Sequence, residues 1–196
     1  MNHTGRKTSV LFYIVEDQGG YFSAAQARSV GFSWERLSNN VKSEQFDRVS
    51  RGVYRFVKFP SSRYEDLFIA WLRSGPESVI SHESALSVYD VSDIISVEIH
   101  VIIPRTASRR RKGIKYHTNK LEENEVTRRE GLPVTTFPRT LADISKSGVA
   151  EEQVVMAIRD GIKKGLVTFE MLRYEAEKRG GRFFNILNNY KKEDNI

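Results

Sequence analysis

The chain has 196 residues, a length that suits one medium domain or two small ones. Its hydrophobic fraction of 39%, with 11 Phe and 8 Tyr, supplies a folded core and argues against a disordered chain. No apolar run reaches the roughly 18 residues of a membrane span, and the run at residues 10–15 is too short for a signal peptide, so we expect no membrane partner. The absence of cysteine excludes disulfides and thiolate metal sites, and it leads us to expect a reducing, cytoplasmic location.

The net charge of +6 is concentrated toward the beginning of the chain. Residues 1–58 contain nine Lys and Arg against five Asp and Glu, whereas residues 121–196 contain thirteen of each. A basic small unit beside a longer neutral one suggests a nucleic-acid-binding domain joined to a second module, although ordinary surface charge explains the difference equally well. Pro60 and two serines separate a β-like run from a helical pattern, so we predict one domain over 1–58 and another over 59–196.

Short helical segments and a β-hairpin follow one another in the first domain. Ser23 and Ser33 have the side chains of helix N-caps, and Gly31 between them suits the end of a helix. Gly52 supplies the positive φ that a tight hairpin turn requires. This order predicts a winged helix-turn-helix. The predicted elements are helices at 9–18, at 24–30 and from 34 onward, an extended pair at 21–22, and strands at 46–49 and 53–56.

The third helix is the predicted recognition helix, which in this motif enters the major groove. Trp34, Leu37 and Val41 recur at helical spacing, so we expect them to face the core. Arg36 has the geometry to pair with guanine, and Asn39 or Asn40 with adenine. The predicted DNA-facing residues of this helix and its cap are Ser33, Arg36, Ser38, Asn39, Asn40 and Lys42, with Glu35 as an opposing charge.

The hairpin is the predicted wing. Arg48, Arg51 and Arg55 are placed to contact phosphates or the minor groove. Winged helices also serve as protein-binding modules, so a solvated helix and an exposed hairpin are the alternative interpretation. Arginine on both the recognition helix and the wing favours DNA binding.

The second domain is predicted to be α+β, with helices, a small sheet and further helices. A strand is expected at 97–103, where apolar residues alternate, and shorter strands at 114–117 and 133–137. Pro138 suits the first turn of a helix, and Thr168 is a further N-cap. The predicted helices are at 63–74, 79–89, 139–147, 151–164 and 169–178.

No motif for catalysis or for a cofactor is present in this second domain. The histidines His82, His100 and His117 are scattered and have neither cysteine partners nor an i,i+4 pair, so we expect no metal site. The sequence also contains no nucleophile elbow, phosphate-binding loop or dinucleotide fingerprint, so we expect no cofactor and no catalytic residue. The alternative hypothesis is an enzyme acting on nucleic acid, with carboxylates such as Glu83 and Asp143 in its active site.

A basic run forms the strongest charge cluster of the chain. It is able to hold nucleic-acid phosphates, but a solvated loop that discourages edge pairing of strands is an equally good interpretation. The residues considered as phosphate contacts are Arg105, Arg109, Arg110, Arg111 and Lys112.

Four segments in register resemble the AbiEi family, the bacterial antitoxins of type IV toxin–antitoxin systems. They are Gly20-Tyr21-Phe22-Ser23-Ala24-Ala25-Gln26-Ala27, Phe46-Asp47-Arg48-Val49-Ser50-Arg51-Gly52-Val53-Tyr54-Arg55, Ile80-Ser81-His82-Glu83-Ser84-Ala85-Leu86 and Phe137-Pro138-Arg139-Thr140-Leu141-Ala142-Asp143. The resemblance extends from about residue 20 to about residue 172.

This resemblance implies a winged-helix repressor that binds inverted repeats in the double-stranded operator DNA of its own operon. It also implies a C-terminal antitoxin domain that counteracts a nucleotidyltransferase-type toxin without a required direct complex. By position, the resemblance assigns DNA contacts to the third helix and to the wing.

Overall fold

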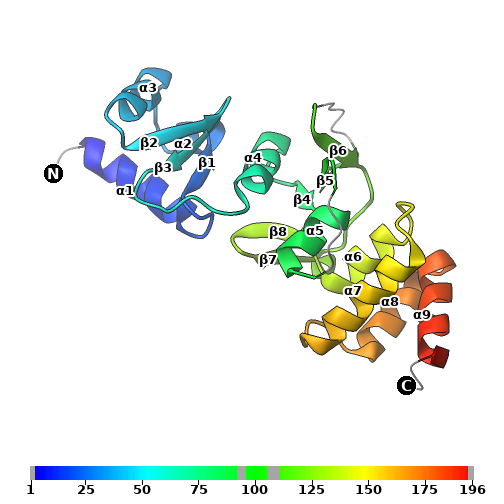
Figure 1. Ribbon diagram of the computed structural model, residues 1–196. Helices are drawn as coiled ribbons and strands as arrows, with labels where there is room; N and C mark the ends of the chain where they lie inside the picture. The colour runs from blue at the N-terminus through cyan, green and yellow to red at the C-terminus, as the bar shows by residue number, and fades with distance from the viewer. Residues whose placement is uncertain (1–2, 92–95, 106–110, 194–196) are drawn as a thin grey trace. The chain divides into compact units, whose positions relative to one another are not determined.

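The computed structural model describes residues 3–91, 96–105 and 111–193, and it confirms an α+β fold (Figure 1). The chain forms two compact units. The N-terminal unit consists of residues 1–77 with 130–132, and the C-terminal unit consists of residues 78–129 with 133–196. Among the described helices, none combines the length and the apolar character needed to cross a lipid bilayer.

The N-terminal unit has the element order of a winged helix-turn-helix, as predicted. A three-stranded antiparallel sheet with the strand order β1-β3-β2 accompanies the helices. The elements are α1 (His3–Glu16), β1 (Tyr21–Ser23), α2 (Ala24–Ser29), α3 (Trp34–Lys42), β2 (Phe46–Ser50), β3 (Val53–Phe56) and α4 (Glu65–Ser74).

Local signals and aromatic packing explain these elements. The Ser23 hydroxyl accepts from the backbone N–H of Gln26 in a capping box, and Gly31 has the φ of 88° that the turn after α2 requires. Phe46 and Phe56 meet edge to face in the core, with ring centroids 4.7 Å apart. Such pairs add to the free energy of apolar burial, so the hairpin is anchored to the helices through its aromatic side chains.

Packing extends the N-terminal unit beyond the predicted boundary at residue 58. The Tyr21 ring stacks on Phe68 of α4 with centroids 4.7 Å apart, and the Tyr21 hydroxyl donates to Glu65 at 2.9 Å. Helix α4 therefore packs on the sheet of the N-terminal unit, and the predicted limits of the DNA-binding domain stay a prediction.

The C-terminal unit combines a five-stranded sheet, in the order β6-β5-β4-β8-β7, with five α-helices among its described residues. Residues 79–80, which we expected in a helix, form a strand that pairs with β5 and β8, and both side chains are buried. Strand β7 and helix α9 were not predicted. The elements are β4 (Val79–Ile80), α5 (His82–Tyr89), β5 (Ile99–Ile102), β6 (Ile114–His117), the 3₁₀ helix η1 (Glu123–Glu125), β7 (Val126–Arg129), β8 (Leu132–Thr135), α6 (Phe137–Ile144), α7 (Glu151–Lys163), α8 (Phe169–Arg179) and α9 (Gly181–Glu193).

A buried ion-pair network joins α6, α8 and η1. The Arg139 side chain is 1% exposed, and its guanidinium contacts Glu125 at 2.7 Å and Asp143 at 2.9 Å. Glu125 also pairs with Lys178 at 3.0 Å and with Arg179. Since a buried charge is tolerated when it is paired and hydrogen-bonded, this network links three segments distant in sequence.

We expect Glu125 to make the stability of the protein pH-dependent. Burial raises the pKa of this carboxyl, but the Glu122 backbone amide, Lys178, Arg139 and Arg179 together lower its pKa to about 2, from 4.5. Because the folded-state pKa is the lower one, the stabilisation is present above pH 4.5 and is lost as the pH falls toward about 2. Urea unfolding of the wild type and of Glu125→Gln between pH 6 and about pH 2.5 measures this effect. The variant should show a flatter acid dependence, and parallel pH profiles would contradict the assignment.

Candidate nucleic-acid interface

Helix α3 presents a polar, exposed side. The Ser33 hydroxyl accepts from the Arg36 backbone N–H at 3.1 Å, which starts the helix where the sequence predicted. Leu37 is fully buried, but Trp34 is 57% exposed, so the prediction that Trp34 faces the core is wrong. Phe32, before the cap, is buried instead, while the Arg28 guanidinium lies 5.1 Å from the Trp34 ring centroid. The exposed residues of α3 are Trp34, Glu35, Ser38, Asn39 and Lys42.

Arg36 and Asn40, two predicted base-reading residues, have partners within the unit. The Arg36 guanidinium lies 4.2 Å from the Phe32 ring centroid and donates to the Thr8 hydroxyl at 3.1 Å. The Asn40 amide donates to the Arg36 carbonyl at 2.7 Å. Base reading by these two side chains stays a prediction, and it requires them to exchange those partners for DNA.

The wing exposes Arg48 and Arg51 but holds Arg55 against the protein. Arg55 pairs with Asp47 at 2.5 Å and donates to the Phe59 carbonyl, with 14% of its side chain exposed. The cross-strand register explains the pair, because Asp47 and Arg55 are direct partners on β2 and β3. The exposed cations of the hairpin are therefore Arg48 and Arg51.

The Arg55→Ala variant should be less stable than the wild type, but its DNA binding should have the same salt dependence. Replacing Arg55 by Ala removes two charge-assisted contacts, so we expect a loss of about 1–2 kcal/mol in unfolding free energy. Chemical denaturation and DNA titrations at several salt concentrations check both halves of this prediction. A salt slope that falls by about one phosphate equivalent would instead place Arg55 on the DNA.

The basic run of the C-terminal unit is described in part. Arg105 and Lys112 are exposed and Arg111 is half-buried. Arg109 and Arg110 lie outside the described residues. The described side chains are consistent with phosphate contacts and equally with a solvated loop.

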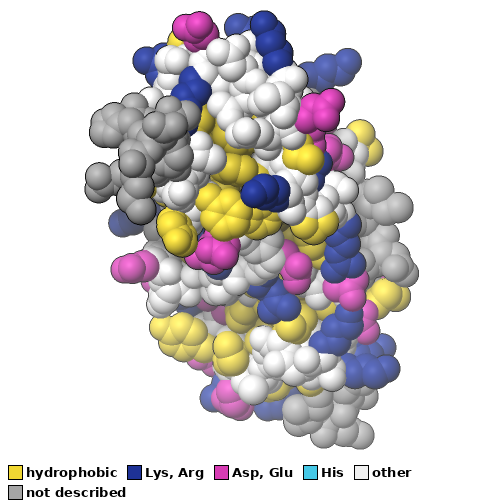
Figure 2. All heavy atoms as spheres, turned by 90° about the vertical axis from the view of Figure 1, so that its left-hand side faces the viewer, with side chains coloured by type: hydrophobic (Ala, Val, Ile, Leu, Met, Phe, Trp, Pro, Cys, Tyr) yellow, Lys and Arg dark blue, Asp and Glu magenta, His cyan; other side chains and the backbone are white. Residues whose placement is uncertain are grey.

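An apolar hollow of about 490 Å³ opens on the N-terminal unit. Its lining includes Phe12, Tyr13, Phe56 and Val57, with Lys58 among the polar residues. Hydrophobic side chains also gather on the face of the molecule shown in Figure 2. The lining also includes Thr8, which accepts from Arg36.

The two carboxylates considered for catalysis are buried and lie beside cationic or imidazole side chains. Asp143 contacts Arg139 within the ion-pair network, and burial raises the pKa of Asp143 although Arg139 opposes this effect. Glu83 lies 2.8 Å from His100 and accepts from the Ser147 hydroxyl at 2.9 Å. Burial raises the pKa of Glu83, but contacts with His100, its own backbone amide and Ser147 outweigh burial and lower the pKa to about 2.

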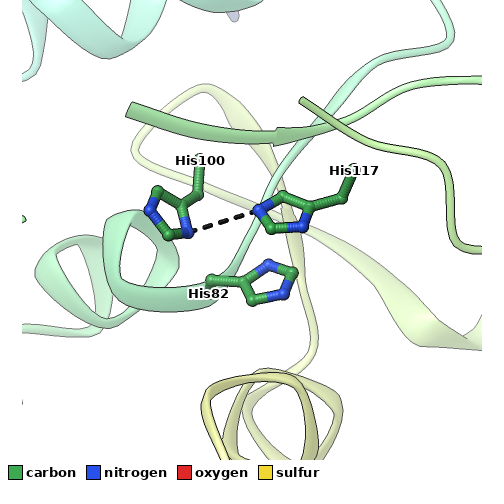
Figure 3. A group of neighbouring side chains, drawn as sticks. All are labelled: His82, His100 and His117. Carbon is green, nitrogen blue, oxygen red and sulfur yellow. Dashed lines mark hydrogen bonds between the residues drawn. The ribbon is translucent and has the colours of Figure 1, made fainter. Parts of the chain in front are cut away.

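The three histidines that looked scattered in the sequence form one cluster in the C-terminal unit (Figure 3). We call His82, His100 and His117 the imidazole cluster. Nε2 of His117 lies 3.3 Å from Nδ1 of His100, and the His82 ring stacks on His117 with centroids 3.7 Å apart. Burial, followed by the neighbouring imidazoles, lowers the pKa of His82 to about 3 and that of His117 to about 4, so both rings are neutral at pH 7.

Sequence spacing could not reveal this cluster. Parallel pairing of β5 and β6 places His117 opposite Ile102, two residues from His100, and α5 brings His82 to the same place. One histidine on each of two predicted strands was the available signal, but the parallel register that unites the strands is a tertiary property.

Comparisons with known proteins agree with this architecture. Residues 9–57 match a family model described as "Transcriptional regulator, AbiEi antitoxin". The fold is similar to the crystal structure of the RV2827C protein from Mycobacterium tuberculosis, with a TM-score of 0.53 and 13% identity. That similarity covers 92% of this chain and 74% of the other, and at this identity it concerns the fold alone. No curated protein matches the chain.

Proposed function

We propose, from the premise that residues 9–57 match the family model of AbiEi antitoxin transcriptional regulators, that the chain represses transcription by binding operator DNA. The operator would be the inverted repeats of its own operon. The observation that carries the proposal is the joint exposure of Arg48 and Arg51 on the hairpin and of Asn39 on α3, which packs against β2. For specific binding, a winged helix requires cations that contact the DNA phosphates. Beside them it requires a polar helix whose side chains contact base edges.

Asn39 is the best-placed base-reading side chain. It is exposed on α3, and its amide has the donor and acceptor geometry that pairs with adenine in the major groove. Asn39→Ala should weaken operator binding by about 1–3 kcal/mol and leave binding to scrambled DNA unchanged. Fluorescence anisotropy with both duplexes measures the difference. Asn188→Ala, at an exposed position of α9, is the matched control.

We further propose that the chain is the antitoxin of a type IV system, with the C-terminal unit counteracting a nucleotidyltransferase-type toxin. The family description of the N-terminal segment supports this proposal. The test is co-expression with a toxin of the nucleotidyltransferase type. An Arg48→Ala/Arg51→Ala chain should lose operator repression and still restore growth, because antitoxin activity would not require DNA contacts. Loss of both activities in this variant would contradict the assignment of DNA binding and antitoxin activity to different units.

We propose no catalytic activity for the chain. Asp143 is held by Arg139, and Glu83 is held among His100 and Ser147, so neither is presented to an external substrate. Metal-dependent cleavage or modification of nucleic acid by the purified chain would favour the enzyme alternative.

A further inference from the structure

Glu83 has a buried oxygen without a hydrogen bond beside the imidazole cluster. The residue is 9% exposed, and its Oε1 accepts from the Ser147 hydroxyl. Its Oε2 lies 2.8 Å from Nδ1 of His100 but accepts no hydrogen bond from any described residue. Nδ1 of His100 is directed at Nε2 of His117 instead, along the dashed line of Figure 3. A buried carboxylate oxygen in this condition costs free energy unless another positive group compensates it.

A cation among the three imidazoles would bring their lone pairs onto one positive charge. We infer that His82, His100 and His117 form a binding site for one divalent transition-metal ion of the zinc class, with the Glu83 carboxylate beside His100 as an outer-shell group. Three imidazole nitrogens, with a water molecule in the fourth position, are a donor set that Zn²⁺ accepts in tetrahedral coordination. The carboxylate supplies negative charge that three neutral rings lack.

The spacing of the donor atoms fits this assignment. One nitrogen from each histidine lies within 4.8 Å of the other two. Tetrahedral bonds of the usual Zn–N length place ligand atoms about 3.3 Å apart. The nitrogens of His100 and His117 are already 3.3 Å apart. The His82 and His117 rings are stacked with an interplanar angle of 15°, so the half-buried His117 ring has to turn before both rings direct lone pairs at one ion.

Neighbouring groups hold the ligand side chains, as outer-shell partners do in metal sites. The Ser81 hydroxyl lies 3.0 Å from Nδ1 of His82, and the Ser84 hydroxyl accepts from the His100 backbone N–H at 2.9 Å. His82 itself has a φ of 51°, a left-handed conformation that is uncommon for residues other than glycine. The backbone is thus kept in an unfavourable conformation at the residue that supplies a ligand from α5.

Metal binding would tie α5, β5 and β6 together and stabilise the C-terminal unit. This role is independent of operator binding, whose residues lie in the N-terminal unit. The competing explanation is a metal-free cluster of stacked, hydrogen-bonded histidines. That explanation gives no role to the convergence of three imidazoles, two of them buried, or to the left-handed φ of His82, which is why the metal site is preferred.

Titration of the chelator-treated, full-length chain with Co²⁺ tests the inference. We expect saturation at one ion per chain, with the intense visible absorption of tetrahedral cobalt, and displacement of that signal by Zn²⁺. Zinc at a hundredfold excess over its Kd should also raise Tm by roughly 5–10 °C. Absence of saturable binding, or octahedral cobalt spectra alone, would overturn the site.

Variants identify the ligands. His117→Gln should weaken cobalt binding about 100-fold or more, and Glu83→Gln, an outer-shell change, should weaken it about 10- to 100-fold. His3→Gln, at the one other histidine of the chain and in the N-terminal unit, is the matched control and should bind like the wild type. Wild-type affinity in His117→Gln would overturn the assignment. If a variant does not fold by circular dichroism, protection of the wild-type histidines from diethyl pyrocarbonate by Zn²⁺ decides instead, and unchanged modification would contradict the site.

Discussion

A triple substitution of Lys42, Arg48 and Arg51 by alanine should weaken operator binding about 500-fold at about 0.1 M salt. All three side chains are exposed, Lys42 on α3 and the two arginines on the hairpin. Each neutralised phosphate contributes about 0.9 logarithmic unit to the binding constant at that salt concentration, because condensed counterions are released from the DNA. The slope of log K against log salt should therefore fall by nearly three units.

A matched triple variant separates specific placement from net charge. Lys163, Arg173 and Lys192 are exposed on α7, α8 and α9, and their replacement by alanine changes the net charge by the same amount. We expect this control to retain operator affinity within a fewfold. Equal losses in both variants would mean that overall charge governs binding, and the wing would lose its assigned role.

Arg139→Met should lower the unfolding free energy by about 3–5 kcal/mol. The substitution retains apolar volume but removes the cation that contacts Glu125 and Asp143, both of which are buried. The cost comes chiefly from the carboxylates that remain without their partner in a region of low dielectric. Urea unfolding followed by circular dichroism measures the change.

Two further variants test whether burial of the two carboxylates causes this loss of stability. Arg173→Met removes an exposed arginine that pairs with Glu170, and it should cost no more than about 0.5 kcal/mol. Adding Asp143→Leu to Arg139→Met should restore part of the lost stability, because the unpaired carboxylate is then replaced by an apolar group. This explanation would be contradicted if the double variant lost as much unfolding free energy as the two single variants together.

The sequence by itself determined the order of elements in the N-terminal unit. The cap at Ser33, the positive φ at Gly31 and the alternation in the hairpin act between near neighbours, so their effects are readable from local spacing. The same local rule predicted a helix opened by Pro138, and α6 begins one residue earlier, at Phe137, which the sequence had assigned to a strand. Helix α9 was missed because the Gly180-Gly181 pair was interpreted as a helix end. Gly180 does end α8, but α9 begins at Gly181, where burial of Phe183 and Ile186 stabilises it.

Tertiary structure alone decided which side chains are available for function. The helical spacing of Trp34 and Leu37 predicted that Trp34 lies in the core. In the structure Phe32 is buried instead, and Trp34 is exposed beside Arg28. Register across β2 and β3 gave Arg55 its partner Asp47. The imidazole cluster depends on the parallel pairing of two strands and on a helix that approaches from another part of the chain. Burial of the whole sheet selects those pairings. Because its free energy comes from many residues distant in sequence, no local pattern predicts the pairings.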